Sequence, residues 1–162
     1  MFHVDYERVR VDRVPVGIIA SYPFTVDNVE FACNLIELSC ELPDIQDVAV
    51  DLVEQEGIIP SAQGAFWMDF DTLQNIIAQT PYEPNPEMRF GYRHWIMIAE
   101  AICEIVAFHQ EEYDCKFYFA EPANERLAVA YQRLIIPKLE KEGYNYYVDE
   151  TEEGGWYVFH KQ

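Results

Sequence analysis

Charge is distributed very unevenly along this chain. Residues 14–88 contain no lysine or arginine, yet they hold thirteen aspartates and glutamates, which supply most of the formal net charge of −18. Such a one-sided field attracts cations and basic surfaces and repels nucleic acid, anionic lipid and most phosphorylated ligands. We therefore expect a partner with a basic protein surface, for example a protein that handles nucleic acid. We expect no direct binding to nucleic acid and none to membranes.

The composition favours a folded domain. Half of the 162 residues are apolar and 15% are aromatic, which is enough for a full hydrophobic core. The length predicts a single domain over residues 1–162, with an acidic helical half (14–88) and a second half (89–162). We find no apolar run of membrane-spanning length, no secretory leader and no C-x-x-C pair. These features predict reduced cysteines and a cytoplasmic protein.

The acidic half is predicted to contain two helices that carry carboxylates in stripes. The first is expected from Thr25 or Asp27 to about residue 42, and the second from Pro43 to about residue 55. Steps of three and four residues place side chains on one face of a helix. The predicted partner-binding residues are eight carboxylates: Asp27, Glu30, Glu37, Glu41, Asp44, Asp47, Asp51 and Glu54.

These stripes have two interpretations. Carboxylates at such steps lie about 5–6 Å apart, which is comparable to the phosphate spacing of a nucleic-acid strand. Two stripes side by side would then imitate DNA for a basic partner. The other interpretation is a solvated helix face in an acidic protein. The sequence leaves both open, because it does not show whether the helices are adjacent.

The rest of the chain predicts alternating strands and helices. Residues 4–20 are predicted to be extended, with Pro23 closing this region, and a strand near 65–68 precedes a short helix near 72–79. Farther on we expect a helix over 95–113, a strand over 115–120 and a helix over 124–142 that is disturbed at Pro137. Strands at 144–149 and 156–160 complete the pattern. The predicted fold class is α/β (α+β), with a mixed central β-sheet flanked by helices.

The C-terminal pattern resembles the second half of the GNAT fold, the acyl-CoA N-acyltransferase family. The matching residues occur in the family's order: Asn124 near a helix start, then Ala128 and Tyr131, then Gly143 and Tyr144. The resemblance covers about residues 89–162. The chain is also similar to small GNAT-like proteins of unknown role that bacteriophages encode. The resemblance implies a degenerate GNAT-like sheet.

The resemblance also implies a cofactor site. In the family, backbone amides at the start of the preceding helix hold the pyrophosphate of coenzyme A, since a helix N-terminus favours negative charge. By this resemblance Arg89, Gly91 and Arg93 would bind acetyl-CoA, and Tyr131 would protonate the departing thiolate. The residues alone are also compatible with Tyr131 as a core aromatic whose hydroxyl lies at the edge.

Three hypotheses for the function follow. The chain contains no complete catalytic or metal-binding motif. The first hypothesis is a non-catalytic binding or inhibitor protein, phage-encoded by resemblance, that needs no cofactor and docks its acidic surface on a basic partner. The alternative is a divergent GNAT N-acetyltransferase that acts on a cationic amine, such as a polyamine or a lysine-rich peptide. The third is an assembly subunit with exposed aromatics at Trp67, Tyr82 and Trp156.

Overall fold

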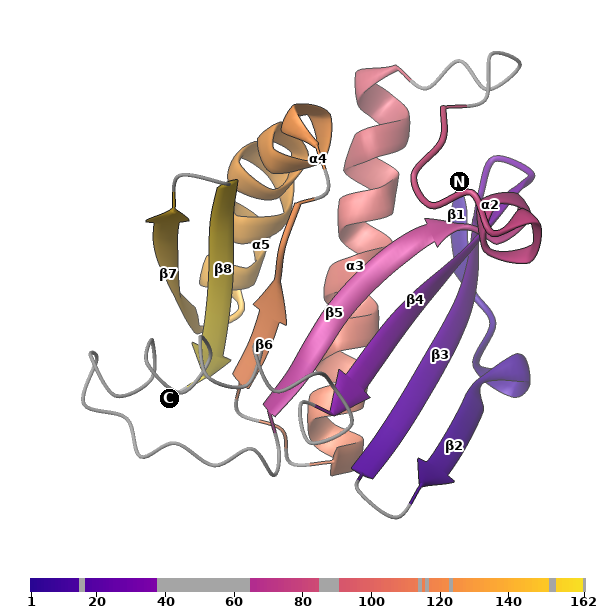
Figure 1. Cartoon of the computed structure of the whole chain (residues 1–162), viewed down its shortest axis with the longest axis horizontal. Coiled ribbons are helices and arrows are strands. Elements are labelled where there is room, and N and C mark those ends of the chain that lie inside the picture. Colours follow the sequence, from indigo (N-terminus) through magenta and orange to yellow (C-terminus); the bar gives the residue numbers. More distant parts are fainter. Residues whose placement is uncertain are drawn as a thin grey trace.

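One mixed sheet of eight strands organises the chain in this computed structural model (Figure 1). The structure describes residues 1–14, 17–37, 65–84, 91–113, 115, 117–122, 124–151 and 154–161. The order across the sheet is β1, β3, β4, β5, β6, β8, β7, and β2 also pairs with β3. The bounds are β1 Phe2–Val4, β2 Arg10–Val14, β3 Gly17–Val26, β4 Val29–Glu37, β5 Ala65–Thr72, β6 Phe117–Ala120, β7 Tyr144–Thr151 and β8 Gly154–Lys161. The predicted fold class, α+β with a mixed sheet, is confirmed.

Two short strands share the outer edge of β3. β1 pairs with residues 24–26 and β2 with residues 17–21, both antiparallel. Pro23 lies between these two stretches. Proline has no N–H group, and at this position neither strand pair loses a hydrogen bond because of it. Its carbonyl accepts a hydrogen bond from the Asp5 N–H at 2.9 Å. Pro23 therefore does not close the extended region, and β3 runs through it to Val26.

A two-residue turn joins β3 to β4. Asp27 and Asn28 have φ values of 46° and 75°, and positive φ at both central residues marks the tight turns that suit twisted antiparallel strands. Val26 pairs with Val29 across the turn. The helix predicted from Thr25 or Asp27 to residue 42 is therefore wrong over residues 25–37. The second predicted helix, residues 43–55, lies outside the described residues.

The helices largely follow the sequence pattern. They are the short 3₁₀ turn η1 Tyr6–Arg8, α2 Leu73–Ala78, α3 Tyr92–Tyr113, α4 Glu125–Ala130, the π-helical turn η3 Tyr131–Ile135 and α5 Ile136–Lys141. Thr72 caps α2 and Asn124 caps α4 through their side-chain oxygens. The helix predicted over 124–142 is confirmed, as is its disturbance near Pro137. A proline ring crowds the carbonyl four residues earlier, at Arg133, which lies within η3.

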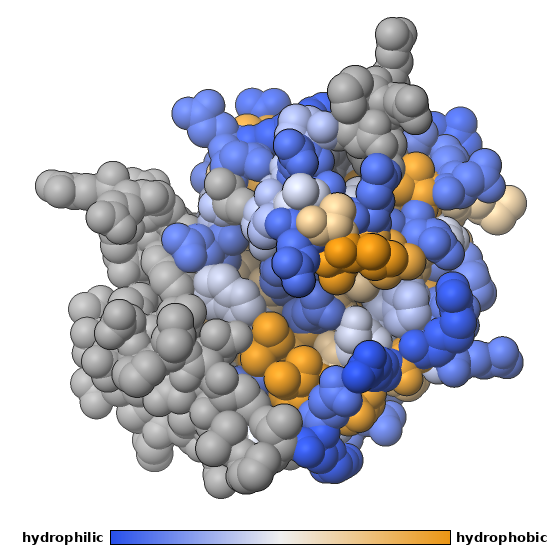
Figure 2. All heavy atoms as spheres, turned by 45° about the vertical axis from the view of Figure 1, so that its right-hand side comes forward, coloured by the Kyte–Doolittle hydropathy of each residue, from blue (hydrophilic) through white to orange (hydrophobic). Residues whose placement is uncertain are grey.

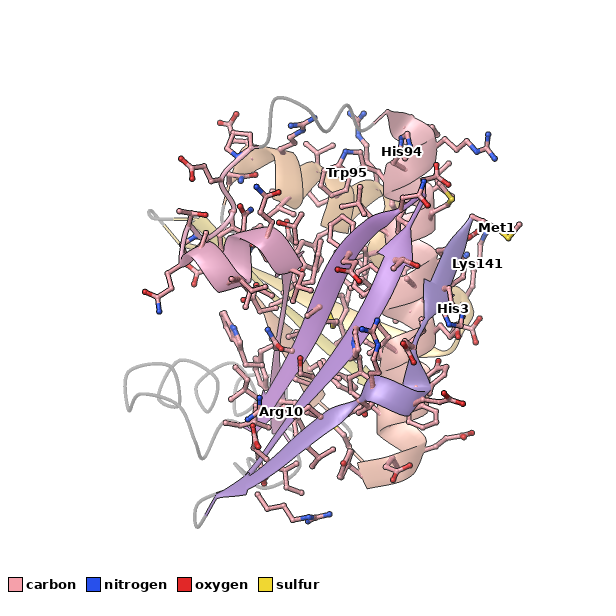
Figure 3. All side chains as sticks on the ribbon, turned by 90° about the vertical axis from the view of Figure 1, so that its right-hand side faces the viewer. Met1, His3, Arg10, His94, Trp95 and Lys141 are labelled. Carbon is pink, nitrogen blue, oxygen red and sulfur yellow. The ribbon has the colours of Figure 1, made fainter. Side chains whose placement is uncertain are left out.

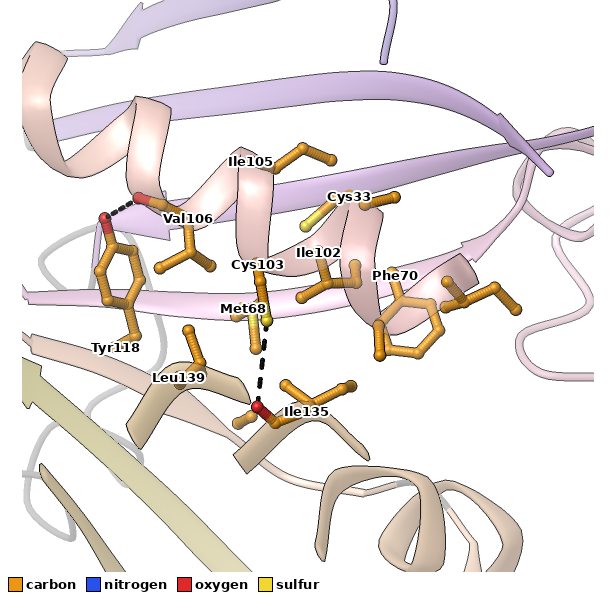
Figure 4. Packing of buried hydrophobic residues seen from close by; sticks show 14 of the residues in the cluster. Cys33, Met68, Phe70, Ile102, Cys103, Ile105, Val106, Tyr118, Ile135 and Leu139 are labelled. Carbon is orange, nitrogen blue, oxygen red and sulfur yellow. Dashed lines mark hydrogen bonds between the residues drawn. The ribbon is translucent and has the colours of Figure 1, made fainter. Parts of the chain in front are cut away.

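The helix α3 builds the core with one face of the sheet. Figure 1 shows α3, α4 and α5 behind the strands, and α3 also contacts η3 and α5. Ile98, Ile102, Ile105 and Val106 recur at helical spacing and are almost completely buried. Figure 4 shows Ile102, Ile105 and Val106 packed with Met68 and Phe70 of β5. The sheet and α3 therefore stabilise each other through apolar burial.

The strands β5 and β6 are the one parallel pair among the described strands. Ala65, Phe66 and Trp67 pair with Phe117, Tyr118 and Phe119. Parallel neighbours need a long crossover connection, and α3 is the longest helix in it. Both strands therefore end at the same edge of the sheet. In the described parts of the chain, no helix is both long and apolar enough to cross a membrane.

One histidine is sealed into this core near the end of α3. His109 is fully buried, with its ring against Tyr22, Phe66, Tyr113 and Tyr118. Its Nδ1 lies 2.8 Å from the Tyr118 hydroxyl, and its Nε2 has no hydrogen-bond partner within the described structure. Burial disfavours the charged imidazolium and lowers the pKa of His109 to about 3.

His109→Phe should flatten the acid dependence of stability. Below the unfolded pKa of 6.5, the unfolded chain binds a proton that folded His109 binds only near pH 3. In the wild type, each unit by which the pH falls within this window should lower the free energy of unfolding by about 1.4 kcal/mol. Urea titrations between pH 7 and 4 measure the slope. His3→Gln is the control, because His3 is exposed; equal slopes for wild type and His109→Phe would contradict the prediction.

Candidate functional site

A pocket opens where β5 and β6 end. Its volume is about 560 Å³, and it is lined by the end of β5, the start of α4, the first turns of α3 and the loop that follows α2. In sheets with parallel strands, ligands typically bind in the crevice at the carboxyl ends of those strands. The volume also lies within the usual range for small-molecule sites. The pocket is therefore the candidate functional site.

The pocket combines an apolar wall with charged groups. Phe31, Phe70, Trp95, Ile98 and Leu127 form the apolar part. The charged lining residues are Asp71, Glu83, Glu125 and Arg126. The Arg126 guanidinium carbon lies 5.9 Å from the centre of the Trp95 ring, within cation–π range. Figure 3 shows Trp95 beside His94 at the start of α3.

Asp71 organises one wall of the pocket. Its Oδ1 accepts hydrogen bonds from the Thr72 N–H at 2.7 Å and the Asn75 side-chain amide at 2.9 Å, and its Oδ2 accepts one from the Tyr82 N–H at 2.7 Å. The Asn75 amide also donates to the Glu83 carbonyl at 3.0 Å. These bonds tie the loop after α2 to the end of β5. Asp71 is therefore the hydrogen-bond acceptor that holds this wall of the pocket together.

Asp69 is the second carboxylate on this part of β5. It precedes Asp71 by two residues, so both side chains leave the same face of the strand. The Tyr82 hydroxyl donates a hydrogen bond to Asp69 Oδ1. Burial raises the pKa of Asp69 above its usual range. A carboxyl group with a raised pKa beside a cleft is a common feature of functional sites.

The start of α3 is only partly open to a ligand. Among the described residues, no atom lies within 4 Å of the position that a Gly91 Cβ would occupy. However, the Gly91 N–H donates to His94 Nδ1 at 3.1 Å, and His94 Nε2 lies 3.1 Å from Asp27. A phosphate could use the Gly91 amide only after His94 turns away. Arg93 is exposed at this helix start, and Arg89 lies outside the described residues.

Tyr131 belongs to the core. It is 3% exposed, stacks on Tyr157 with ring centres 5.5 Å apart and contacts the Phe70 ring at 6.2 Å. Burial raises the pKa of Tyr131 well above its usual value of 10. It is not among the described residues that line the pocket, whereas Phe70, whose ring it contacts, does line it. This placement agrees with the interpretation of Tyr131 as a core aromatic.

The predicted acidic stripe does not exist in the described part of the chain. Asp27 lies in the turn, where its Oδ1 accepts a 2.6 Å bond from the amino group of Met1. Glu30 is on β4, with Oε1 4.0 Å from Arg8. Glu37 is 9% exposed and accepts a 2.8 Å bond from the Ile18 N–H. The other five predicted partner-binding residues lie outside the described residues: Glu41, Asp44, Asp47, Asp51 and Glu54.

Sequence reasoning missed the residues that shape the pocket. Asp71, Asn75, Tyr82 and Arg126 were not predicted as site residues, and Tyr82 was expected to be an exposed aromatic. In the structure Tyr82 is half-buried against the core. One signal was present in the sequence: Asp69 and Asp71 follow the apolar run 65–68, and in the structure they lie in the last part of β5. The face of the molecule that Figure 2 shows is mixed, with apolar patches among hydrophilic residues.

Comparison of this chain with protein-family models, curated proteins and solved structures finds no match. The assignment of a function therefore depends on the geometry of the site.

Replacing Asp71 by alanine should destabilise the protein. The change leaves the Tyr82 N–H, the Thr72 N–H and the Asn75 amide without their acceptor, so the free energy of unfolding should fall by about 1–3 kcal/mol. Urea denaturation measures the loss. Asp12→Ala removes a carboxylate from an exposed position and should change stability by less than about 0.5 kcal/mol. Equal effects of the two variants would contradict the structural role of Asp71.

Proposed function

We propose that this chain is a divergent N-acyltransferase that binds acetyl-CoA in the pocket beyond the ends of β5 and β6. The observation that carries the proposal is the position of the pocket, at the shared edge where the parallel pair ends. The GNAT resemblance of residues 89–162 implies a pyrophosphate site at the start of the helix before β6. That helix is α3, and its residues Trp95 and Ile98 line the pocket.

The charges around the pocket support an anionic cofactor at one side only. Arg126 lines the pocket in the first turn of α4, and Arg93 stands at the start of α3. Helix starts carry partial positive charge, which favours phosphate groups. Glu83 and Glu125 add negative charge that a cationic substrate would favour.

The proposed reaction joins an amine to an acyl group. The amine nitrogen attacks the thioester carbonyl, an amide bond forms and the carbon–sulfur bond breaks. A carboxylate takes the proton that the attacking nitrogen loses, and the departing thiolate takes up a proton. By the family resemblance Tyr131 would donate that proton, although it is buried beside Phe70 and is not among the described residues that line the pocket. The net charge of −18 favours a cationic acceptor such as a polyamine.

Acetyl-CoA titration with charge-reversal variants tests the cofactor. We expect micromolar binding to the wild type by calorimetry and a loss of about tenfold or more in Arg126→Glu, because one phosphate contact turns into a repulsion. Arg10→Glu is the matched control: it makes the same change in net charge on β2, far from Trp95 and toward the other end of the sheet (Figure 3). No binding at millimolar acetyl-CoA, or equal losses in both variants, would refute the proposed cofactor site.

Measuring the turnover of a polyamine by Tyr131→Phe provides a second test of the same proposal. We expect unchanged acetyl-CoA affinity with a turnover rate lowered by about 100-fold, within the usual range for loss of a general acid. Unchanged turnover would remove Tyr131 from the reaction.

The second candidate is a cytoplasmic acidic protein that docks on a basic partner. The observation that supports it is the net charge of −18 together with the absence of lysine and arginine over residues 14–88. Since Asp27, Glu30 and Glu37 do not form a helical stripe, this proposal now depends on the five carboxylates between residues 41 and 54. If these carboxylates imitate the charge of DNA, the partner would be a nucleic-acid-handling protein, and docking would inhibit it.

Reversing those five carboxylates to lysine tests docking. A lysine-rich peptide of about 20 residues serves as the probe, and its affinity is measured at two salt concentrations. The matched control reverses five exposed carboxylates on described elements: Glu7, Asp12, Glu111, Glu112 and Glu140. A docking surface predicts a loss at least about tenfold larger for the first variant. Equal losses would show that only net charge matters.

A further inference from the structure

The loop after α2 forms one wall of the pocket, and hydrogen bonds with the side chains of Asp69, Asp71 and Asn75 are among the contacts that hold it. We name residues 80–84 the pocket loop. Tyr82, Glu83 and Pro84 of this loop line the pocket opposite Trp95 of α3. The Tyr82 ring is half-buried and packs against the core. Any change in the position of this loop would therefore change the size of the pocket.

Hydrogen bonds with three side chains and with one backbone carbonyl, that of Asn75, hold the pocket loop. The Tyr82 N–H donates to Asp71, the Glu83 carbonyl accepts from the Asn75 amide, and the Tyr82 hydroxyl donates to Asp69. At the near end, the Thr80 N–H donates to the Asn75 carbonyl at 3.0 Å and the Thr80 hydroxyl to Asn75 Oδ1 at 3.3 Å. A segment held mainly by a few polar bonds opens more easily than one held by apolar packing.

The backbone of the loop also stores strain. Tyr82 has a φ of 58°, in the left-handed region where a bulky side chain is unfavourable. Such conformations persist only where surrounding contacts impose them, and they cluster at ligand clamps and switches. Here the imposing contacts are the bonds from Tyr82 to Asp69 and Asp71. Releasing Tyr82 would relieve the strain, which offsets part of the cost of breaking those bonds.

Asp69 needs a hydrogen-bond donor. It lies on the same face of β5 as Asp71, and it is not among the described residues lining the pocket, whereas Tyr82 is. The Tyr82 hydroxyl thus links the pocket wall to a carboxylate that lies behind it. Burial penalises the charged form of Asp69 and raises its pKa. When Tyr82 moves, another donor must satisfy this oxygen or water must enter.

We propose that the pocket loop is a lid, that Tyr82 is its latch, and that opening the lid extends the pocket to Asp69. There the carboxylate accepts a hydrogen bond from a donor on the ligand, such as a hydroxyl, an amide or an ammonium group, in place of the Tyr82 phenol. The proposal rests on the pocket being the ligand site. It adds a subsite and a gate that the proposed acyl transfer does not require.

Amide exchange measured by NMR tests the lid in the protein as it stands. The three amides of the loop, at Thr80, Tyr82 and Glu83, all donate hydrogen bonds in the closed form. A lid predicts that the three exchange together, faster than the core amides of α3. Tyr82→Phe removes only the latch hydroxyl and should speed this exchange about tenfold or more.

The control for this measurement is Tyr6→Phe. It removes a similar bond, from the Tyr6 hydroxyl to Glu104 at 2.8 Å, at a site away from the pocket loop. We expect no change in loop exchange for this variant. Loop amides that exchange only with global unfolding, at the pace of the α3 core, would overturn the lid. An equal acceleration in Tyr6→Phe would also overturn it.

Rescue of a latch-deleted variant tests the subsite at Asp69. Tyr82→Gly removes the side chain at a φ that glycine adopts without strain, so the loop backbone is preserved. The probes are p-cresol, which restores the deleted side chain, and toluene, which lacks the hydroxyl. We expect p-cresol to bind at least about tenfold more tightly than toluene, because it donates to a carboxylate.

Equal affinity for the two probes would overturn the donor subsite. The double variant Tyr82→Gly with Asp69→Ala should lose the preference for p-cresol, and a preference that persists there would assign the hydroxyl to another acceptor and also overturn it. Neither measurement contains acetyl-CoA. A result that contradicts the lid can therefore be distinguished from a result that contradicts the proposed acyltransferase.

Discussion

The packing of α3 against the sheet is the constraint on which the rest of the structure depends. Parallel strands cannot be joined by a tight turn, so β5 and β6 become neighbours only because the chain crosses over through α3. The apolar face of α3, with Ile98, Ile102 and Ile105, is stable only when the strands bury it. The same crossover brings the ends of β5 and β6 to one edge of the sheet. The pocket is thus a consequence of how the core is assembled.

The carboxylates of this acidic protein do several different things. Asp71 and Glu37 accept hydrogen bonds from backbone N–H groups, and Asp69 accepts one from Tyr82. Asp27 shapes a turn and contacts the start of α3 through His94. An internal hydrogen bond holds each of these four side chains in place, so none of them is simply a free charge for a partner. Net charge still governs what approaches the molecule at long range, while the individual residues serve the fold and the pocket wall.

The parts of the fold that the sequence predicted share a local cause. The 3.6-residue spacing in α3, the helix starts near Thr72 and Asn124 and the hairpin of β7 and β8 are all set by neighbours in the chain. Residues 27–37 were predicted wrongly because acidic residues three and four apart imitate a helical stripe. The aromatic and β-branched residues around the turn at Asp27 and Asn28 favour strands. Alternate residues of β4, namely Phe31, Cys33 and Leu35, are buried on one face of the sheet.

By itself the sequence determined the charge, the order of the C-terminal elements and the existence of a mixed sheet, because these depend on composition and on periodicity within short segments. Only the tertiary structure decided where chemistry can take place. Asp69 and Asp71 meet Tyr82, and Trp95 meets Arg126, across separations in the chain that no local pattern encodes. The crossover through α3 and the turn after α2 bring these residues together, and the pocket exists because apolar packing holds those elements at one edge of the sheet.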